Sequence, residues 1–190
     1  MPVAGVDVGS VAAKAVVLDE EKKIVLGRAV LPTGWNSREA GEQVLQAACR
    51  AAGVEPAGLR RVVGTGYGRV ALPFADKVVT EISCHARGAS WLFPATGVVL
   101  DIGGQDSKVI AVEDGAVQDF VMNDKCAAGT GRFLQVLSGI LGMELPELGQ
   151  AAATGKPVSI SSMCAVFAET EIIGLLAQGT APADIAAGVY

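Results

Sequence analysis

Histidine, aromatic residues and basic residues are all scarce in this sequence of 190 residues. Its single histidine excludes a metal site built from several histidines, and aromatic residues make up 5%. Lys and Arg number 15 against 20 Asp and Glu, and the formal net charge of −5 argues against a nucleic-acid-binding surface. No apolar run approaches the roughly 18–20 residues of a membrane span, and the N-terminus lacks a signal-peptide pattern. We therefore expect a cytoplasmic protein that binds neither nucleic acid nor a membrane.

Cysteine is also limited, with four residues. In the cytoplasm these should be thiols, metal ligands or redox groups rather than structural disulfides. The abundant components are glycine, with 24 residues, and apolar residues, which make up 51% of the chain. This composition is typical of α/β proteins with apolar strands and tight turns. The length allows one large domain or two small lobes.

An internal repeat organises the chain. The strand-like segment ending in Asp-Val-Gly-Ser near the N-terminus returns as an apolar segment ending in Asp-Ile-Gly-Gly. Three residue pairs match at a constant offset of 94: Asp7 and Asp101, Gly9 and Gly103, and Lys14 and Lys108. Each copy continues into a second strand, an acidic turn and a third strand. Repetition of whole supersecondary units predicts a duplicated α/β fold, with one lobe over residues 1–94 and another over residues 95–190.

The hydrophobic pattern predicts the secondary structure around this repeat. Asn36 and Glu39 have the spacing of a capping box, and Gly53 is placed to end the helix that follows. Strands are expected at residues 2–8, 14–18, 24–30, 59–63, 77–80, 98–102, 107–110, 116–122 and 158–161. Helices are expected at residues 37–52, 82–91 and 165–176 and along the stripe of Phe133, Leu137, Ile140 and Leu141. Residues 146–156 read as a polar or small-residue connection.

The two Asp-x-Gly turns predict a nucleotide cleft. Glycine lets the backbone approach a phosphate, and a carboxylate can hold Mg²⁺ through water. One such turn alone would be an ordinary β-turn, but two copies in register favour nucleotide binding. We assign catalytic roles to Asp7, Asp101 and Gln105, with Mg²⁺ held by the two aspartates. Gln105 is suited to orient an attacking water, although it could be a simple turn residue. The predicted ATP contacts are Gly9, Ser10, Lys14, Gly103, Gly104, Gly129, Thr130 and Gly131.

The segment Asn123–Phe133 combines a cysteine, a Gly-Thr-Gly turn and the start of a helix. The N-terminus of a helix favours phosphate and also favours the thiolate form of a nearby cysteine. Cys126 and Cys164 both precede predicted helices, so both are candidate metal ligands. Two thiolates do not complete a four-thiolate iron–sulfur site, but a symmetric dimer would bring four together.

The other cysteines have simpler interpretations. Cys49 lies among alanines within a predicted helix, where a free cysteine usually acts as a small hydrophobic residue. Cys84 and His85 invite a Cys–His catalytic reading, but neighbours on a helix do not face each other, which favours a structural role. Glu169 and Glu171 follow Cys164 and interact well with a helix dipole, or else lie near a metal or nucleotide.

These segments resemble a known family. Asp101–Lys108, Asn123–Phe133 and Cys164–Glu169 are similar to the signature segments of 2-hydroxyacyl-CoA dehydratase activators and of the ATPase subunits of benzoyl-CoA reductases. Thr80–Ala86 and Gly64–Arg69 resemble further segments of the same family. The resemblance covers essentially the whole chain, and the segment around Cys126 is highly specific.

The resemblance implies a fold and an activity. The fold would be the duplicated, ribonuclease H-like two-lobe ATPase fold of actin and the sugar kinases. The protein would be a homodimer with one [4Fe–4S] cluster held by Cys126 and Cys164 of each subunit. With ATP/ADP and Mg²⁺ as further cofactors, it would pass single electrons from a ferredoxin or flavodoxin donor to a partner dehydratase or reductase. The family's adenosine-binding glycine segment does not occur in the chain, so we expect an incomplete second lobe in a piece of a longer or split protein.

The resemblance also suggests how ATP would act. We hypothesise that Mg·ATP at Asp7, Asp101 and the Gly-Thr-Gly turn changes the angle between the lobes and moves the helices behind Cys126 and Cys164. Two alternatives share the phosphate turns: a small-molecule kinase of the same superfold and a nucleotide-binding module that does not hydrolyse ATP. The cysteine pair separates the first hypothesis from a kinase, which does not need it.

Overall fold

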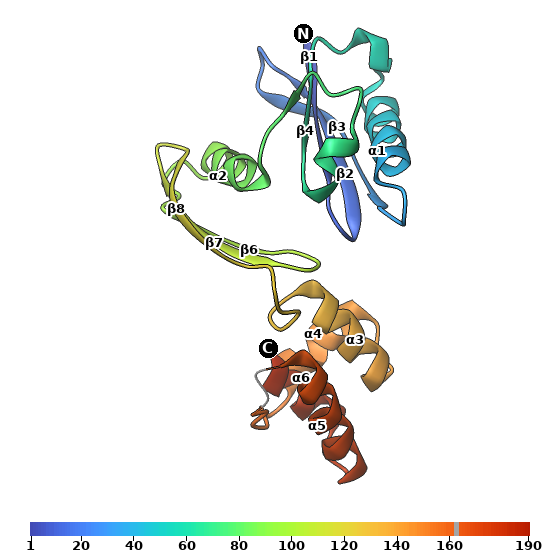
Figure 1. The fold of residues 1–190 in the computed structure, drawn as a ribbon, viewed down its shortest axis with the longest axis vertical. Helices are drawn as coiled ribbons and strands as arrows, with labels where there is room; N and C mark the ends of the chain where they lie inside the picture. The colour runs from blue at the N-terminus through green and yellow to red at the C-terminus, as the bar shows by residue number, and fades with distance from the viewer. Residues whose placement is uncertain (162–163) are drawn as a thin grey trace. The chain divides into compact units, whose positions relative to one another are not determined.

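The computed structural model describes residues 1–161 and 164–190, and the chain forms two compact units (Figure 1). Unit 1 comprises Met1–Val99 and Ile110–Phe120, and unit 2 comprises Leu100–Val109 and Val121–Tyr190. The division passes through a three-stranded sheet, so its strands contribute residues to both units.

Unit 1 contains a five-stranded sheet in the order β3-β2-β1-β4-β5. Its strands are β1 (Pro2–Val8), β2 (Ala12–Asp19), β3 (Ile24–Pro32), β4 (Val62–Thr65) and β5 (Lys77–Val78). The first three pair antiparallel, and β4 and β5 continue the sheet in parallel pairs. The strand expected at residues 59–63 lies further along the chain, because the β1 ladder pairs Ala4 with Val62 and Pro56–Gly58 form a 3-10 turn.

Helix α1 (Ser37–Ala52) makes the crossover between β3 and β4 and confirms the predicted helix. The Asn36 side chain accepts a hydrogen bond from the Glu39 amide, and Gly53 ends the helix at a left-handed φ of 65°. The helix packs on β1 and β2, and together they bury an aliphatic core that includes Val6, Val8, Val17 and Val44 (Figure 1). The alternation of buried residues along β1 follows from the two-residue period of a strand with one covered face.

The second copy of the repeat forms a separate three-stranded sheet in the order β6-β7-β8. It consists of β6 (Val98–Ile102), β7 (Ser107–Glu113) and β8 (Ala116–Asn123), preceded by helix α2 (Glu81–Leu92). Ala86 of α2 forms a small buried cluster with Ile110 and Val112 of β7. The predicted elements in this part of the chain are confirmed.

Unit 2 is mainly helical beyond β8 (Figure 1, orange to red). Its helices are α3 (Gly131–Leu141), α4 (Leu145–Thr154), α5 (Ala165–Ala177) and α6 (Pro182–Val189). Their core is formed by fully buried Leu137, Leu148, Ile172 and Ile185. No helix within residues 1–161 and 164–190 is long and apolar enough to cross a membrane.

Two expectations in unit 2 are wrong. The connection expected at residues 146–156 is largely helix α4, because Pro146 is tolerated in a first turn and Glu144 and Glu147 form a capping box. The strand expected at residues 158–161 is absent from the residues described there. Val158 instead donates a single backbone hydrogen bond to Asp184 of α6, at 3.3 Å, and has no strand ladder. Helix α6 was not expected at all.

Candidate nucleotide and metal-binding site

The first Asp-x-Gly turn joins β1 to β2 in unit 1. The Gly9 amide donates to the Ala12 carbonyl at 3.1 Å and closes the turn. Asp7 and Lys14 are direct partners in the antiparallel ladder, and Lys14 Nζ lies 3.0 Å from Asp7 Oδ2. Ser10 is half-buried in the same turn. The turn therefore places a carboxylate, an ammonium group and a glycine backbone together, as expected from the sequence.

A second loop of unit 1 packs against Asp7. Thr65, the last residue of β4, is the ladder partner of Asp7 in the parallel β1–β4 pair. Gly66 follows with φ 88°, and a Cβ at this position would clash with Asp7 Oδ1 and with the Val8 carbonyl. Arg69 holds the loop by donating from Nη1 to the Gly66 carbonyl at 2.9 Å. Glycine is required at residue 66 both by its φ and by the carboxylate beside it.

Thr65 is a candidate residue that the sequence analysis did not single out. Its side chain is buried, and its Oγ1 has no hydrogen-bond partner among the residues described. Buried hydroxyls are usually paired, so an unpaired one calls for an explanation. Asp7 and Thr65 are paired near the ends of adjacent parallel strands, at the edge where α/β sheets bind ligands. The signal in the sequence was a polar residue closing an apolar strand just before glycine.

The second Asp-x-Gly turn, in unit 2, repeats the first with a more deeply buried lysine that pairs with two carboxylates. The Gly103 amide donates to the Asp106 carbonyl at 2.8 Å, the same bond that Gly9 makes. Lys108 Nζ lies 3.2 Å from Asp101 Oδ2 and 2.8 Å from Asp106 Oδ1. The Lys108 side chain is only 2% exposed, against 46% for Lys14. The sequence analysis did not single out Asp106, because the corresponding residue of the first copy, Ala12, has no carboxylate.

Gln105 and Gly104 occupy the tip of this second turn. Gln105 is exposed, as a residue that orients water needs to be, and Gly104 is half-buried. The Gly104 carbonyl accepts a hydrogen bond from the Arg132 amide at 2.8 Å, and the Gly103 carbonyl accepts one from the Gly131 amide at the same distance. The start of α3 is thus attached to the turn through two backbone bonds.

This attachment changes the expected role of the Gly-Thr-Gly segment. The sequence suggested that amides at the start of α3 are free to bind phosphate. The amides of Gly131 and Arg132 are instead directed to carbonyl groups of the second turn, and the Thr130 amide donates to the Ala127 carbonyl at 3.1 Å. Gly129 is exposed at φ 70° and has no neighbour within 4 Å of an added Cβ. Of this segment, Gly129 remains the most open to a ligand.

Cys126 lies in the loop between β8 and α3 and is half-buried. The Asn123 side chain makes three hydrogen bonds to the backbone of this loop. Its Oδ1 accepts from the Cys126 amide at 3.1 Å, and its Nδ2 donates to the carbonyls of Cys126 at 2.9 Å and Ala128 at 3.3 Å. Thr130 is buried, and its hydroxyl donates to the Ala127 carbonyl at 2.5 Å. A free thiol is therefore held in an ordered loop that is bonded to the second turn.

Cys164 is exposed and forms the N-cap of α5. Glu171, two turns into the helix, accepts hydrogen bonds from the amide and the hydroxyl of Ser161, both at 3.2 Å. Glu171 thus holds Ser161 against α5, whereas Glu169 is half-buried on the same helix. The residues described include no group of three or more His, Cys, Asp and Glu side chains that could hold a metal ion. Within residues 1–161 and 164–190, Cys126 and Cys164 are therefore free thiols without a complete set of metal ligands around them.

The remaining cysteines behave differently. Cys49 is buried in the core of unit 1, and burial raises the pKa of its thiol, which confirms its expected role as a small hydrophobic residue. Cys84 and His85 are consecutive residues of α2. Consecutive residues of a helix do not face each other, so a structural role for this pair stays the prediction.

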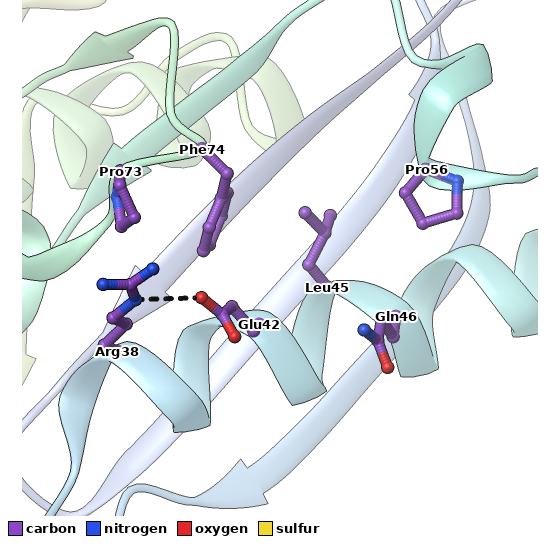
Figure 2. A pocket seen from close by; sticks show the side chains of 7 residues that line it. All are labelled: Arg38, Glu42, Leu45, Gln46, Pro56, Pro73 and Phe74. Carbon is purple, nitrogen blue, oxygen red and sulfur yellow. Dashed lines mark hydrogen bonds and ion pairs between the residues drawn. The ribbon is translucent and has the colours of Figure 1, made fainter.

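A surface groove of about 420 Å³ lies elsewhere on unit 1 (Figure 2). It runs between α1 and the segment before β5, with the Arg38–Glu42 ion pair at one end and Phe74 on its wall (Figure 2). The full lining is Arg38, Glu42, Leu45, Gln46, Pro56, Pro73 and Phe74. None of the predicted site residues lines it, so it is separate from the two Asp-x-Gly turns.

Solved structures show which class of protein this is. The crystal structure of the (R)-2-hydroxyglutaryl-CoA dehydratase component A from Acidaminococcus fermentans superimposes with a TM-score of 0.95 at 42% identity, covering 100% of this chain and 73% of that one. The activator of the 2-hydroxyisocaproyl-CoA dehydratase from Clostridium difficile, solved with bound ADPNP, gives 0.92 at 40% identity, covering 100% and 70%. The chain thus shares the α/β fold of these dehydratase activators, one of which was solved with a bound nucleotide analogue.

The family follows from the sequence match. The chain belongs to the BadF/BadG/BcrA/BcrD ATPase family, whose sequence model matches residues 4–190. Among characterised relatives, the (R)-2-hydroxyglutaryl-CoA dehydratase activating ATPase of Acidaminococcus fermentans is 44% identical over 188 residues, which are 98% of this chain and 72% of that protein. The family resemblance read from the motifs is confirmed.

Proposed function

We propose that this protein is an ATP-dependent activator that donates low-potential electrons to a 2-hydroxyacyl-CoA dehydratase or a benzoyl-CoA reductase-type enzyme. In each cycle ATP would be hydrolysed, one electron would pass to the partner enzyme, and one electron from a ferredoxin or flavodoxin would replace it. The observation that carries the proposal is the position of Cys126, in a loop bonded through Gly131 and Arg132 to the second Asp-x-Gly turn. A small-molecule kinase has no need of a thiol there.

The nucleotide roles are assigned to the residues of the two turns. Asp7 and Asp101 are proposed to hold Mg²⁺ through water, and Gln105 to orient the attacking water. Lys14 and Lys108 keep the aspartates oriented until Mg·ATP arrives. The predicted phosphate contacts remain Gly9, Ser10, Lys14, Gly103, Gly104, Gly129, Thr130 and Gly131. For Thr130 and Gly131 the contact requires their carbonyl-bonded amides to be released, so Gly129 is the first of the segment to test.

The thiolates of Cys126 and Cys164 are proposed to hold half of a [4Fe–4S] cluster, which supplies one-electron chemistry at low potential when bound. A single chain lacks a complete ligand set in the part that the structure describes. A homodimer with a two-fold axis would bring four cysteines together. Both thiols are free, and neither is a fully buried core residue like Cys49, so the donor set fits such a group.

The test is anaerobic purification followed by iron and sulfide analysis and EPR spectroscopy, with Cys126→Ala and Cys164→Ala in parallel. We expect about four irons per dimer in the wild type and loss of iron in either variant. Cys84→Ala is the matched control, since Cys84 is also a partly exposed free thiol, and it should keep its iron.

The alternatives predict other outcomes. An iron-free dimer that binds ATP under strict anaerobiosis and phosphorylates a small molecule would replace the proposal with a kinase. An iron-free protein that binds ATP without turnover would make it a nucleotide-binding module.

A further inference from the structure

The structure points to a specific physical link between the second Asp-x-Gly turn and Cys126. We infer that Asn123 and Thr130 are positioning residues: Asn123 fixes the backbone of Cys126, and Thr130 connects that loop to the turn through α3. This inference rests on the proposed function, because it assigns a role to residues around a proposed cluster ligand. All of its contacts lie within unit 2.

The first step of the link is the Asn123 side chain. It bonds both the amide and the carbonyl of Cys126, and it also bonds the Ala128 carbonyl. One amide side chain thus holds the cysteine on both sides of its Cα. Since Asn123 is the last residue of β8, the loop is anchored to the three-stranded sheet at this end. A thiol on a loop held in this way has little freedom to move unless the loop moves as a body.

The second step is Thr130 at the other end of the loop. Its amide and its hydroxyl both donate to the carbonyl of Ala127, the residue after Cys126. Thr130 is 1% exposed, so these bonds are protected from competition with water. Thr130 is also the N-cap of α3. A displacement of the start of α3 would therefore move Ala127, the residue next to Cys126, through the bonds from Thr130.

The third step joins α3 to the phosphate turn. The Gly131 and Arg132 amides each donate at 2.8 Å to the carbonyls of Gly103 and Gly104. A Cβ on Gly131 would lie 3.2 Å from the Gly103 carbonyl oxygen, so the two glycine backbones are in close contact. If nucleotide binding shifts the backbone of the turn, these two hydrogen bonds would pass the shift to the start of α3. Because they join backbone to backbone directly, no flexible side chain lies between the two segments.

This link makes a prediction that a merely stabilising loop does not. If Asn123 only stabilised the fold, its replacement would lower the free energy of unfolding and leave the spectrum of a loaded cluster unchanged. If it positions Cys126, the EPR signal and the rate of iron loss should change in the folded protein. If Thr130 transmits the state of the turn, its replacement should weaken the dependence of these readouts on nucleotide, with the iron content preserved.

The experiment uses the whole chain, loaded anaerobically, in five forms: wild type, Asn123→Asp, Asn123→Ala, Thr130→Val and Thr130→Ser. Asn123→Asp retains the oxygen that accepts the Cys126 amide and loses the two N–H donors. Thr130→Ser retains the hydroxyl that Thr130→Val removes. The measurements are EPR spectra of the reduced protein and the rate at which a colorimetric chelator removes iron, each with ADP and with ADPNP.

Two matched controls remove comparable bonds elsewhere. Asn36→Ala removes an asparagine side chain that accepts a backbone amide at the start of α1. Thr96→Val removes a hydroxyl that donates to the carbonyl three residues earlier, as Thr130 does, at 2.7 Å. Both controls should behave like the wild type in the iron measurements.

We expect the chelation rates of the wild type with the two nucleotides to differ by about fivefold or more. In Thr130→Val, measured with each nucleotide at a saturating concentration, that ratio should fall toward one while the iron content persists, and Thr130→Ser should restore it. Both Asn123 variants should lose iron faster with either nucleotide and show an altered EPR signal, Asn123→Ala more than Asn123→Asp.

Wild-type iron and EPR signals that persist unchanged in all four variants would overturn the inference while leaving the proposed function intact. Loss of the nucleotide effect in the Thr96→Val control as well would also overturn it, because the path would then not be specific. Absence of iron from the wild type would instead defeat the proposed function itself.

Discussion

The two copies of the repeated hairpin share a backbone and differ in what covers them. In β1, Val6 and Val8 are 0% exposed under α1, whereas their counterparts Leu100 and Ile102 in β6 are 66% and 58% exposed. The same apolar alternation thus produces a buried face in one copy and an open face in the other. The turn at the end of each strand is nevertheless conserved in geometry, with the amide of the glycine bonded to the carbonyl three residues on.

The comparison teaches that the Asp-x-Gly turn does not depend on which face of its sheet a helix covers, because α2 packs on Ile110 and Val112 in the second copy. In the first copy the hairpin is held from the side by α1 and its core. In the second copy the compensating feature is Lys108, a buried ammonium group that joins Asp101 to Asp106. The first turn has a single, more exposed ion pair, and its strands are covered by α1 and the aliphatic core.

The lysines should therefore differ most in their effect on stability. We expect Lys108→Met to lower the free energy of unfolding of unit 2 by about 3 kcal/mol, since it leaves two partly buried carboxylates close together. Lys14→Met should cost less than about 1 kcal/mol, because the pair it breaks is partly exposed to water. Urea denaturation of both variants measures the difference. Equal losses would mean that the two turns are supported in the same way.

Truncation of Val6 and of Leu100 tests whether burial of this strand face contributes to stability in each copy. Val6→Ala should cost about 2 kcal/mol, because it opens a cavity in the packed core beneath α1. Leu100→Ala removes a larger side chain but should cost less than about 1 kcal/mol, since the side chain is largely exposed. Chemical denaturation followed by circular dichroism distinguishes them. A large loss at Leu100 would show that something buries this face in solution.

Thr65 separates ligand binding from stability in the first copy. Thr65→Val removes a buried hydroxyl that has no partner among the described residues, so the free energy of unfolding should rise by about 1 kcal/mol. The affinity for Mg·ATP, measured by calorimetry, should fall if the hydroxyl serves the ligand. Thr33→Val is the contrasting variant: its hydroxyl donates to the Gly9 carbonyl at 2.8 Å, and its removal should destabilise the protein. A Thr65 variant with unaltered affinity would remove Thr65 from the site.

Cys49 should produce the smallest effect, a dependence of the free energy of unfolding of unit 1 on pH. Burial raises the pKa of this thiol in the folded protein. Above about pH 8.5 the thiol of the unfolded chain loses its proton while the folded one keeps it. The unfolded state then binds fewer protons, so the free energy of unfolding should fall as the pH rises further. Denaturation between pH 7 and pH 10 measures this, and Cys49→Ala should lack that part of the decline.

The strongest expectations from sequence were those with two independent signals. The helix at Ser37–Ala52 had a capping box and a terminal glycine, and its bounds are confirmed. Helix α4 was missed because its alanines and Pro146 suggested a linker, and only the Glu144–Glu147 cap marked its start. The segment at residues 158–161 looked like a strand because it is apolar in places, but a strand exists only where a neighbour completes its hydrogen bonds.

The sequence by itself determined the repeat with its matched aspartates and lysines, the family and the cysteines worth testing, because these depend on local spacing along the chain. Only the tertiary structure decided that the amides at the start of α3 are bonded to the Gly103–Gly104 turn, that the Asn123 side chain is hydrogen-bonded to the backbone of Cys126 and that Thr65 lies beside Asp7. Such contacts join residues that are distant in sequence or depend on side-chain direction. They arise from packing and hydrogen-bond satisfaction across the whole fold, which no periodicity in the sequence encodes.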